Sequence, residues 1–262
     1  MNFLGRNKIR AFDITGDVAI VEAPTLSNAK EMAKAIMQQH KHIKSVWMKK
    51  GGHEGKHRIQ KLKWVSGKKS TITIHKENGI SLKLDIARVY FSPRQATERK
   101  RICEQVKKGE QALVMFSGIC PFTISIAKNT AAASVSGIEI NKTAHRYALE
   151  NVKINKVEAK VNLFCGDARK IAPTLHKKFD RIVMPLPKGA ESFLDVAFSA
   201  VKKGAIVHFY DFEKEEDIPD KAIAKVEAAA TAAKKKIRVL AVVKCGQLAP
   251  RAYRVCVDFK II

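Results

Sequence analysis

The stretch ALVMFSGICPF, residues 112–122, decides the fold of the C-terminal part of the chain. It is apolar, breaks at Ser117-Gly118 and becomes apolar again, which predicts a buried strand, a tight turn and a helix. A turn in this position often holds a nucleotide-like cofactor. Core packing would explain the same apolar residues, and Cys120 stands where a second glycine would fit more easily. The stretch alone therefore leaves both interpretations open.

Around this stretch, helix and strand patterns alternate from about residue 92 to the C-terminus. Such alternation predicts a mostly parallel sheet covered on both faces. The last two strand patterns, 237–245 and 253–262, have no helix between them, which predicts an antiparallel hairpin at the edge of the sheet, with an antiparallel C-terminal strand. We therefore expect residues 92–262 to form a Rossmann-like α/β domain.

Residues 1–91 show a different pattern, typical of a small α+β domain. A helix is predicted over 26–40, and strands over 45–50 and 57–67 with a flexible segment at 51–55 between them. Asn78-Gly79 separates two alternating apolar runs, which predicts a hairpin because a type I′ turn needs two positive φ angles.

The charge balance is the most unusual property of the composition. The 262 residues include 49 Lys and Arg against 25 Asp and Glu, a formal net charge of +24, and basic residues cluster at 41–63 and 94–108. A field of this sign attracts polyanions. We therefore expect nucleic acid as the partner, rather than a basic surface that serves only solubility.

Other global features exclude several classes of protein. Hydrophobic residues make up 46% of the chain, enough for a sizeable core, and no apolar run approaches the length of a membrane span. The N-terminus does not resemble a signal peptide. Five cysteines without metal or disulfide spacing predict neither a zinc site nor a disulfide framework. We expect a soluble, cytoplasmic monomer without a metal.

Polar residues follow three neighbouring strands of the predicted sheet. They are Ser117-Gly118 after the first strand, Glu139 at the end of the second and Asp167 after the third. A carboxylate at the second position can accept from a ribose diol, and an Asp after the third strand can accept from an adenine amino group. Each could instead be a cap or turn residue, but together they indicate an adenosyl cofactor. No GxGxxG motif follows the first strand, which argues against NAD.

Several motifs resemble those of the archaeal and eukaryotic tRNA guanine-N1 methyltransferases, which act on the purine 3′ of the anticodon, position 37. They are YFSPRQATERKRI, VMFSGICPFTISIAK, GIEINKTAHRYALENVKIN, GDARK, FDRIVMPLPKGAESFLD and HFYDF, and the resemblance covers nearly the whole chain. It implies a class I methyltransferase fold, S-adenosylmethionine as cofactor and tRNA as partner. The family's N-terminal domain, which contacts the outer corner of tRNA, is expected to be missing here.

The resemblance also assigns site residues. Glu98 matches the proposed general base, and Arg58 matches an arginine that stabilises the negative charge moving toward guanine O6. Arg94 and Pro187 are expected to contact the substrate. The cofactor is expected to contact Phe116, Ser117, Gly118, Glu139, Ile140, Asp167, Ala168 and Pro185. Without the resemblance, Glu98 would be read as an acid at a helix start and Arg58 as one more basic strand residue.

Three positions depart from the family pattern. Val114 replaces an Asp, Cys120 replaces a Gly, and Pro185 replaces an Asn that would face the target base. A sister family that transfers the aminocarboxypropyl group of the same cofactor in wyosine-type base synthesis also lacks that Asn. The motifs GICPFTI, IEIN and GDAR resemble the methylating family more closely. We expect N1 methylation of guanosine 37 on this ground, and keep two alternatives: aminocarboxypropyl transfer, and a tRNA-binding protein with a weakened cofactor site.

Overall fold

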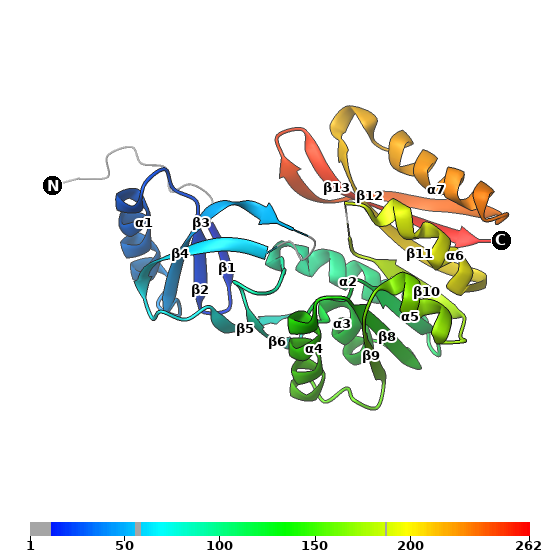
Figure 1. Cartoon of the computed structure of the whole chain (residues 1–262), viewed down its shortest axis with the longest axis horizontal. Helices are drawn as coiled ribbons and strands as arrows, with labels where there is room; N and C mark the ends of the chain where they lie inside the picture. The colour runs from blue at the N-terminus through cyan, green and yellow to red at the C-terminus, as the bar shows by residue number, and fades with distance from the viewer. Residues whose placement is uncertain (1–11, 56–58, 187) are drawn as a thin grey trace. The chain divides into compact units, whose positions relative to one another are not determined.

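The computed structural model describes residues 12–55, 59–186 and 188–262, and within it the chain divides into two compact units (Figure 1). The smaller unit ends at Pro93 and excludes residues 78–80. The larger unit runs from Arg94 to Ile262 and includes residues 78–80. The predicted domain boundary after residue 91 lies two residues before the change from one unit to the other.

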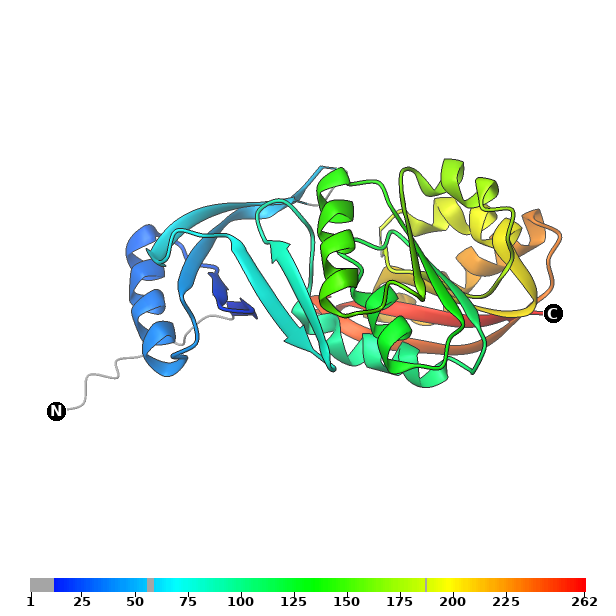
Figure 2. The same ribbon diagram turned by 90° about the horizontal axis from the view of Figure 1, so that it is seen from below.

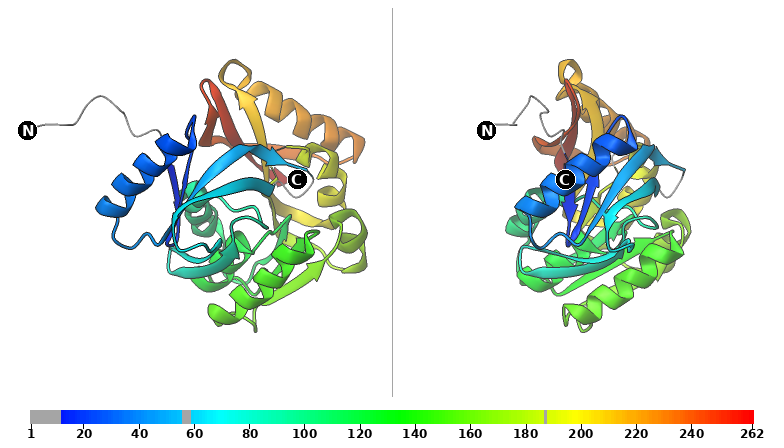
Figure 3. Two further views of the ribbon diagram at one scale, coloured as in Figure 1. Left: turned by 60° about the vertical axis from the view of Figure 1, so that its left-hand side comes forward. Right: turned by 90° about the vertical axis from the view of Figure 1, so that its left-hand side faces the viewer.

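The smaller unit contains a four-stranded sheet in the order β1-β2-β3-β4. Its strands are β1 (Phe12–Thr15), β2 (Val18–Val21), β3 (Ser45–Glu54) and β4 (Ile59–Gly67). Helix α1 (Leu26–Gln39) joins the parallel strands β2 and β3 and lies along the sheet (Figure 3). Ala29, Ala33 and Ile36, at helical spacing, form its buried face. The predicted helix is thereby confirmed.

Two details of the segment before Pro93 test the predicted strands. The segment 51–55 is not a break, because β3 continues through Gly51 and Gly52 to Glu54 with an irregular register against β4. The hairpin at Asn78-Gly79 is confirmed: φ is +42° and +76° at the two residues, and β5 (Ile72–Glu77) and β6 (Ile80–Asp85) form a two-stranded sheet.

The larger unit contains a seven-stranded sheet in the order β12-β13-β11-β10-β7-β8-β9. The strands are β7 (Gln111–Met115), β8 (Ser134–Glu139), β9 (Val161–Cys165), β10 (Phe179–Met184), β11 (Val201–Lys214), β12 (Ile237–Ala249) and β13 (Ala252–Ile261). Strands β7 to β11 pair in parallel, whereas β13 is antiparallel to both β11 and β12. The predicted mostly parallel sheet with an antiparallel C-terminal strand is confirmed.

Helices cover both faces of this sheet (Figure 2). They are α2 (Ala96–Gln105), α3 (Pro121–Asn129), α4 (Lys142–Ile154), α5 (Ala168–Thr174), α6 (Leu194–Ala200) and α7 (Asp220–Ala232), with short 3₁₀ turns η1 (Pro93–Gln95), η2 (Ala190–Phe193) and η3 (Glu215–Asp217). Residues of α5, α6 and α7 join the main core with apolar residues of the strands. Within residues 12–55, 59–186 and 188–262, no helix is long and apolar enough to cross a membrane.

The helical patterns of residues 94–109 and 188–204 predict helices that stop at Gly109 and Gly204, and both of these predicted ends are wrong. Helix α2 ends at Gln105 rather than at Gly109. The helix predicted to stop at Gly204 ends at Ala200, because Val201 already pairs with Phe179 as the first residue of β11. A β-branched residue beside a neighbouring strand favours the extended conformation over another helical turn.

Candidate active site

The chain leaves β7 through a loop with an unusual backbone. Phe116, Gly118 and Cys120 all have positive φ, at +60°, +57° and +69°. Cys120 is the residue before α3, and Pro121 then begins the helix, where its missing N–H costs nothing. The left-handed conformation explains why glycine would fit more easily than cysteine at position 120. Burial raises the pKa of the Cys120 thiol to about 12, so the side chain is neutral at pH 7.

Glu139 holds this loop against β8. Its Oε2 accepts from the N–H of Gly118 at 2.7 Å, and its Oε1 accepts from the N–H of Asn141 at 2.6 Å. The main chain reinforces the contact, because Ser117 N–H donates to the carbonyl of Ile138 at 2.8 Å. Gly137 allows the close approach, since a Cβ there would lie 3.1 Å from Ser117 Oγ and 2.9 Å from Leu163. The loop and the end of β8 are thus one rigid assembly.

The third strand end adjoins the second. Gly166 N–H donates to the carbonyl of Glu139 at 2.9 Å. Asp167 caps α5 by accepting from Arg169 N–H at 2.9 Å. It therefore has the helix-capping role that the sequence pattern allowed as the alternative to a cofactor contact. Ala168, the first residue of α5, is buried, and Ile140 is half-buried.

The fourth strand end, after β10, lies beside the loop because β10 pairs with β7. Pro185 is half-buried there, and Leu186 N–H donates to Met184 O at 2.8 Å. Phe116 packs edge-on against Phe193, with ring centroids 4.8 Å apart. The carboxyl ends of β7, β8, β9 and β10 therefore bring all eight predicted cofactor residues to one edge of the sheet, which we call the cofactor edge (residues 116–120, 139–140, 166–168 and 185).

The residues at this edge fit an adenosyl cofactor. Glu139 is an acceptor at the place that suits a ribose diol, and the glycine at 118 lets a ligand approach the backbone closely. Val114 is fully buried in β7, so the position where the family pattern has an Asp is part of the core. When bound, S-adenosylmethionine would supply an activated methyl group on a sulfonium; the residues of the edge would bind and orient it.

Glu98 lies on the first turn of α2 and is only 4% exposed. Its Oε1 accepts from Tyr210 Oη at 2.6 Å and from Arg101 Nη2 at 2.7 Å, and its Oε2 accepts from Arg101 Nε at 2.7 Å. The Tyr210 ring lies 6.0 Å from that of Phe122, which belongs to the helix that follows the cofactor loop. Glu98 is therefore connected through one side chain to the α3 side of the cofactor edge.

Beneath α2, further polar groups continue from Glu98 in a chain of hydrogen bonds. Arg101 Nη1 donates to Asp258 Oδ2 at 2.5 Å, and His208 Nδ1 lies 2.6 Å from Asp258 Oδ1. On the other side of the imidazole, Arg181 Nη1 lies 2.6 Å from His208 Nε2, and Arg181 Nε donates to Glu110 at 2.7 Å. We call this set the buried polar column: Glu98, Arg101, Asp258, His208, Arg181 and Glu110.

The hydrogen bonds assign the His208 tautomer. Arginine has only donors, so Nε2 must accept from Arg181 and the ring proton must sit on Nδ1, facing Asp258. Burial lowers the pKa of His208; the bond to Asp258 opposes this, and the nearby guanidinium groups of Arg181 and Arg101 act in the same direction as burial. Burial alone would raise the pKa of Asp258, but its bonds to His208 and Arg101 hold it well below the usual range. The column therefore contains a neutral histidine between charged partners.

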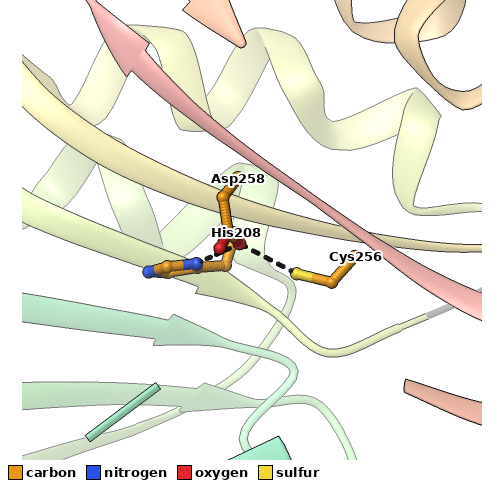
Figure 4. A group of neighbouring side chains, drawn as sticks. All are labelled: His208, Cys256 and Asp258. Carbon is orange, nitrogen blue, oxygen red and sulfur yellow. Dashed lines mark hydrogen bonds and ion pairs between the residues drawn. The ribbon is translucent and has the colours of Figure 1, made fainter. Parts of the chain in front are cut away.

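His208, Cys256 and Asp258 also lie close enough together to be considered as metal ligands, within 4.8 Å of one another (Figure 4). Cys256 Sγ lies 3.2 Å from Asp258 Oδ1, and burial raises the pKa of this thiol well above its usual value. A cation there would lie beside the guanidinium groups of Arg101 and Arg181, with a protonated thiol as a poor ligand. The arrangement fits a hydrogen-bonded network better than a metal site.

Other predicted residues lie apart from these groups or cannot be placed. Arg94 is exposed in η1, one turn before Glu98. Arg58 and Pro187 lie outside the described residues, so their predicted roles remain predictions. Sequence reasoning missed Arg101 and Tyr210, which hold Glu98, and Asp258, which holds Arg101. The helical spacing of positions 98 and 101 was a readable signal for one pair, but no local pattern links either residue to 210 or 258.

Comparisons with known proteins agree with this geometry. Residues 73–240 match the TRM5/TYW2 methyltransferase domain, and residues 4–70 match the TYW2 N-terminal domain. The tRNA (guanine(37)-N(1))-methyltransferase Trm5b of Pyrococcus abyssi is 41% identical over 253 residues, which are 96% of this chain and 74% of that protein. The tRNA(Phe) (4-demethylwyosine(37)-C(7)) aminocarboxypropyltransferase of Methanocaldococcus jannaschii is 31% identical over 245 residues, 94% of this chain and 95% of that one.

Among solved structures, the complex of aTrm5 and tRNALeu matches with a TM-score of 0.86 and 33% identity. The match covers 97% of this chain and 72% of that one. The similarity thus includes the fold as well as the sequence.

Proposed function

Because the chain belongs to the TRM5/TYW2 methyltransferase family, we propose that it transfers the methyl group of S-adenosylmethionine to N1 of guanosine 37 in tRNA. The observation that carries the proposal is the position of a buried carboxylate, Glu98, which Tyr210 connects to the helix after the cofactor loop. The higher identity to the guanine-N1 methyltransferase, 41% against 31% for the aminocarboxypropyltransferase, favours methyl transfer.

The proposed reaction moves one proton and one methyl group. Guanine N1 is a poor nucleophile until its proton leaves, and Glu98 Oε2 accepts that proton. When bound at the cofactor edge, S-adenosylmethionine would supply the methyl group to the N1 electron pair, and the carbon–sulfur bonding pair would stay on the sulfur of the product, S-adenosylhomocysteine. Glu98 later loses the proton to water. Arg58 is proposed to stabilise the charge that moves toward O6, and Arg94 and Pro187 to contact the nucleotide.

Recognition of the base must use groups other than an amide at position 185. Pro185 offers only a carbonyl acceptor, with no N–H donor. We propose that its carbonyl and the residues after it contact the splayed base, which has to leave the anticodon stack to be reached. Val114 and Cys120, which differ from the family pattern, leave the cofactor loop intact. We propose that they change the affinity for the cofactor rather than the reaction.

The smaller unit is proposed to bind the anticodon stem. Its exposed lysines supply positive charge for phosphates and include Lys30, Lys34, Lys41, Lys44, Lys63, Lys68, Lys69 and Lys76. Contacts of exposed lysines with phosphates position the nucleic acid but do not read its sequence. We further propose that the protein is a monomer and that it is located in the cytoplasm, where tRNA is modified.

Incubation of the protein with unmodified tRNA and labelled S-adenosylmethionine, followed by digestion and mass analysis of nucleosides, tests the function. The expected product is N1-methylguanosine, absent when guanosine 37 is replaced by adenosine. An aminocarboxypropyl adduct would establish the sister chemistry instead. If calorimetry shows no cofactor binding at high concentration, the protein is a tRNA-binding protein without this activity.

The role of Glu98 has its own test. Glu98→Gln removes the proton acceptor and should lower turnover about 10²- to 10⁴-fold, with tRNA affinity unchanged. Turnover equal to that of the wild type would remove Glu98 from the mechanism while leaving the identity of the product untouched.

A further inference from the structure

The surroundings of Glu98 fix its carboxylate in one orientation. Arg101 reaches both oxygens, through Nε to Oε2 and through Nη2 to Oε1, each at 2.7 Å. Tyr210 is the third donor to the carboxylate and bonds to Oε1. A carboxylate has about four lone-pair positions, so the donors in the described part of the chain occupy two on Oε1 and one on Oε2. The remaining acceptor position is on Oε2.

Arg101 is in turn held by a second carboxylate. Its Nη1 donates to Asp258 Oδ2 at 2.5 Å, and its Nη2, which also serves Glu98, lies 3.3 Å from Asp258 Oδ1. Asp258 is only 3% exposed and has further partners in His208, Cys256 and Gln105. The guanidinium therefore cannot rotate away from Glu98 without breaking bonds at both ends.

The secondary structure makes this arrangement rigid. Positions 98, 101 and 105 follow one face of α2, with the spacing that places side chains over one another. His208 and Tyr210, two residues apart on β11, face the same side of the sheet, and Asp258 lies opposite His208 on β13. One helix face and two adjacent strands thus define the position of a single carboxylate.

We propose that Arg101, anchored by Asp258 and assisted by Tyr210, is a positioning residue that directs the open acceptor position of Glu98 Oε2 to the proton of the target base. The inference rests on the proposed function of Glu98 as general base. Buried ion pairs are often no more stabilising than apolar residues of the same volume. A role in fixing one orientation accounts for burying two carboxylates and a guanidinium together.

Replacement of Arg101 by lysine tests the proposal, because lysine keeps the charge but cannot bond to both oxygens of Glu98 and to Asp258. Single-turnover methylation at saturating cofactor and tRNA should fall about 10- to 100-fold, while the Kd for tRNA and for cofactor changes less than about twofold. Asp258→Asn and Tyr210→Phe, which preserve shape, should show the same split between rate and affinity, with smaller losses.

Two controls separate positioning from general damage. Lys225→Met breaks another partly buried ion cluster of the larger unit, with Asp211 and Glu213, and should leave the methylation rate unchanged. In the Glu98→Gln background, Arg101→Lys should cause little further loss, because a positioning residue acts through the residue it holds.

The outcomes are distinguishable. If Glu98→Gln is inactive but Arg101→Lys and Tyr210→Phe keep the wild-type rate, the positioning role is overturned and the general base stands. Additive losses in the double variant, or an equal loss in Lys225→Met, also overturn it. If Glu98→Gln keeps full activity, both the base assignment and the positioning role are wrong. Cofactor binding by each variant, measured by calorimetry, shows that the larger unit is folded.

Discussion

The cofactor edge and the buried polar column each hold a carboxylate of the larger unit, but by different means. Glu139 is held by backbone N–H groups of Gly118 and Asn141, both near it in the sheet or the chain. Glu98 is held by side chains of Arg101 and Tyr210, and the column beyond it draws on three further strands or loops. The position of a carboxylate bonded to backbone N–H groups depends on strand order. The position of a carboxylate bonded to side chains depends on the identity of every partner residue. The column should therefore be more sensitive to single substitutions.

The largest effect is expected from removing the charge at the far end of the column. Arg181 is fully buried and bonded to Glu110, His208 and the carbonyl of Gln105. Arg181→Met should lower the free energy of unfolding by about 3–5 kcal/mol, the usual result of breaking a buried pair. Urea denaturation measures it. Lys202→Met, which breaks the more exposed pair with Asp180, should cost less than about 1 kcal/mol; equal losses would contradict the comparison.

The next effect concerns the cofactor edge. Glu139→Gln presents an amide N–H₂ to one of two backbone donors, so either Gly118 or Asn141 loses its acceptor. Stability should fall by about 1–3 kcal/mol, and cofactor affinity should fall more than about tenfold. Calorimetry measures the cofactor affinity, and urea denaturation measures the stability. Glu158→Gln, on an exposed position, is the control and should change neither. Unaltered cofactor affinity in Glu139→Gln would remove this carboxylate from the cofactor site.

A pH effect sharpens the comparison, because only the column contains a buried neutral histidine. The pKa of His208 is lowered from its ordinary value of 6.5, so the unfolded chain binds the proton first. The stabilisation is complete above pH 6.5 and is lost as the pH falls below it, by at most about 1.4 kcal/mol per pH unit. Urea midpoints from pH 7.5 to pH 5 should show this slope. His208→Asn should be less stable at pH 7.5 and have a shallower slope; an unchanged slope would assign the effect elsewhere.

The smallest effect is expected from the glycine substitution at position 120 in the cofactor loop. Cys120→Gly relieves a left-handed backbone, worth about 1–2 kcal/mol, but removes a buried side chain and loosens the unfolded chain by a similar amount. The net change in the free energy of unfolding should be within about 1 kcal/mol. Cys120→Val should lose about 2 kcal/mol or more, because a β-branched residue tolerates positive φ poorly. Denaturation of the three proteins compares them; equal stability of the valine variant would contradict the strain at this position.

The sequence by itself determined most of the cofactor edge. Strand periodicity, the break at Ser117-Gly118 and the acidic residue ending the next strand are local patterns, and a parallel sheet brings their carboxyl ends together whatever the side chains are. The same locality explains why the Asn78-Gly79 hairpin was predictable. Helix ends were less so, because pairing of Val201 with Phe179 across the sheet overrode the helical pattern of residues 188–204.

Only the tertiary structure decided how Glu98 is held. Its partner Tyr210 is 112 residues away, and Arg101 meets Asp258 over 157 residues, with no periodicity that relates them. Charged residues on a helix are usually solvated, and nothing in the pattern of α2 marks one of its acids as buried. Packing of α2 on β11 and β13 removes Glu98, Arg101 and Asp258 from much of the water, and burial requires charged groups to find partners. The sequence thus predicted a carboxylate for the reaction, and the fold supplied the groups that orient it.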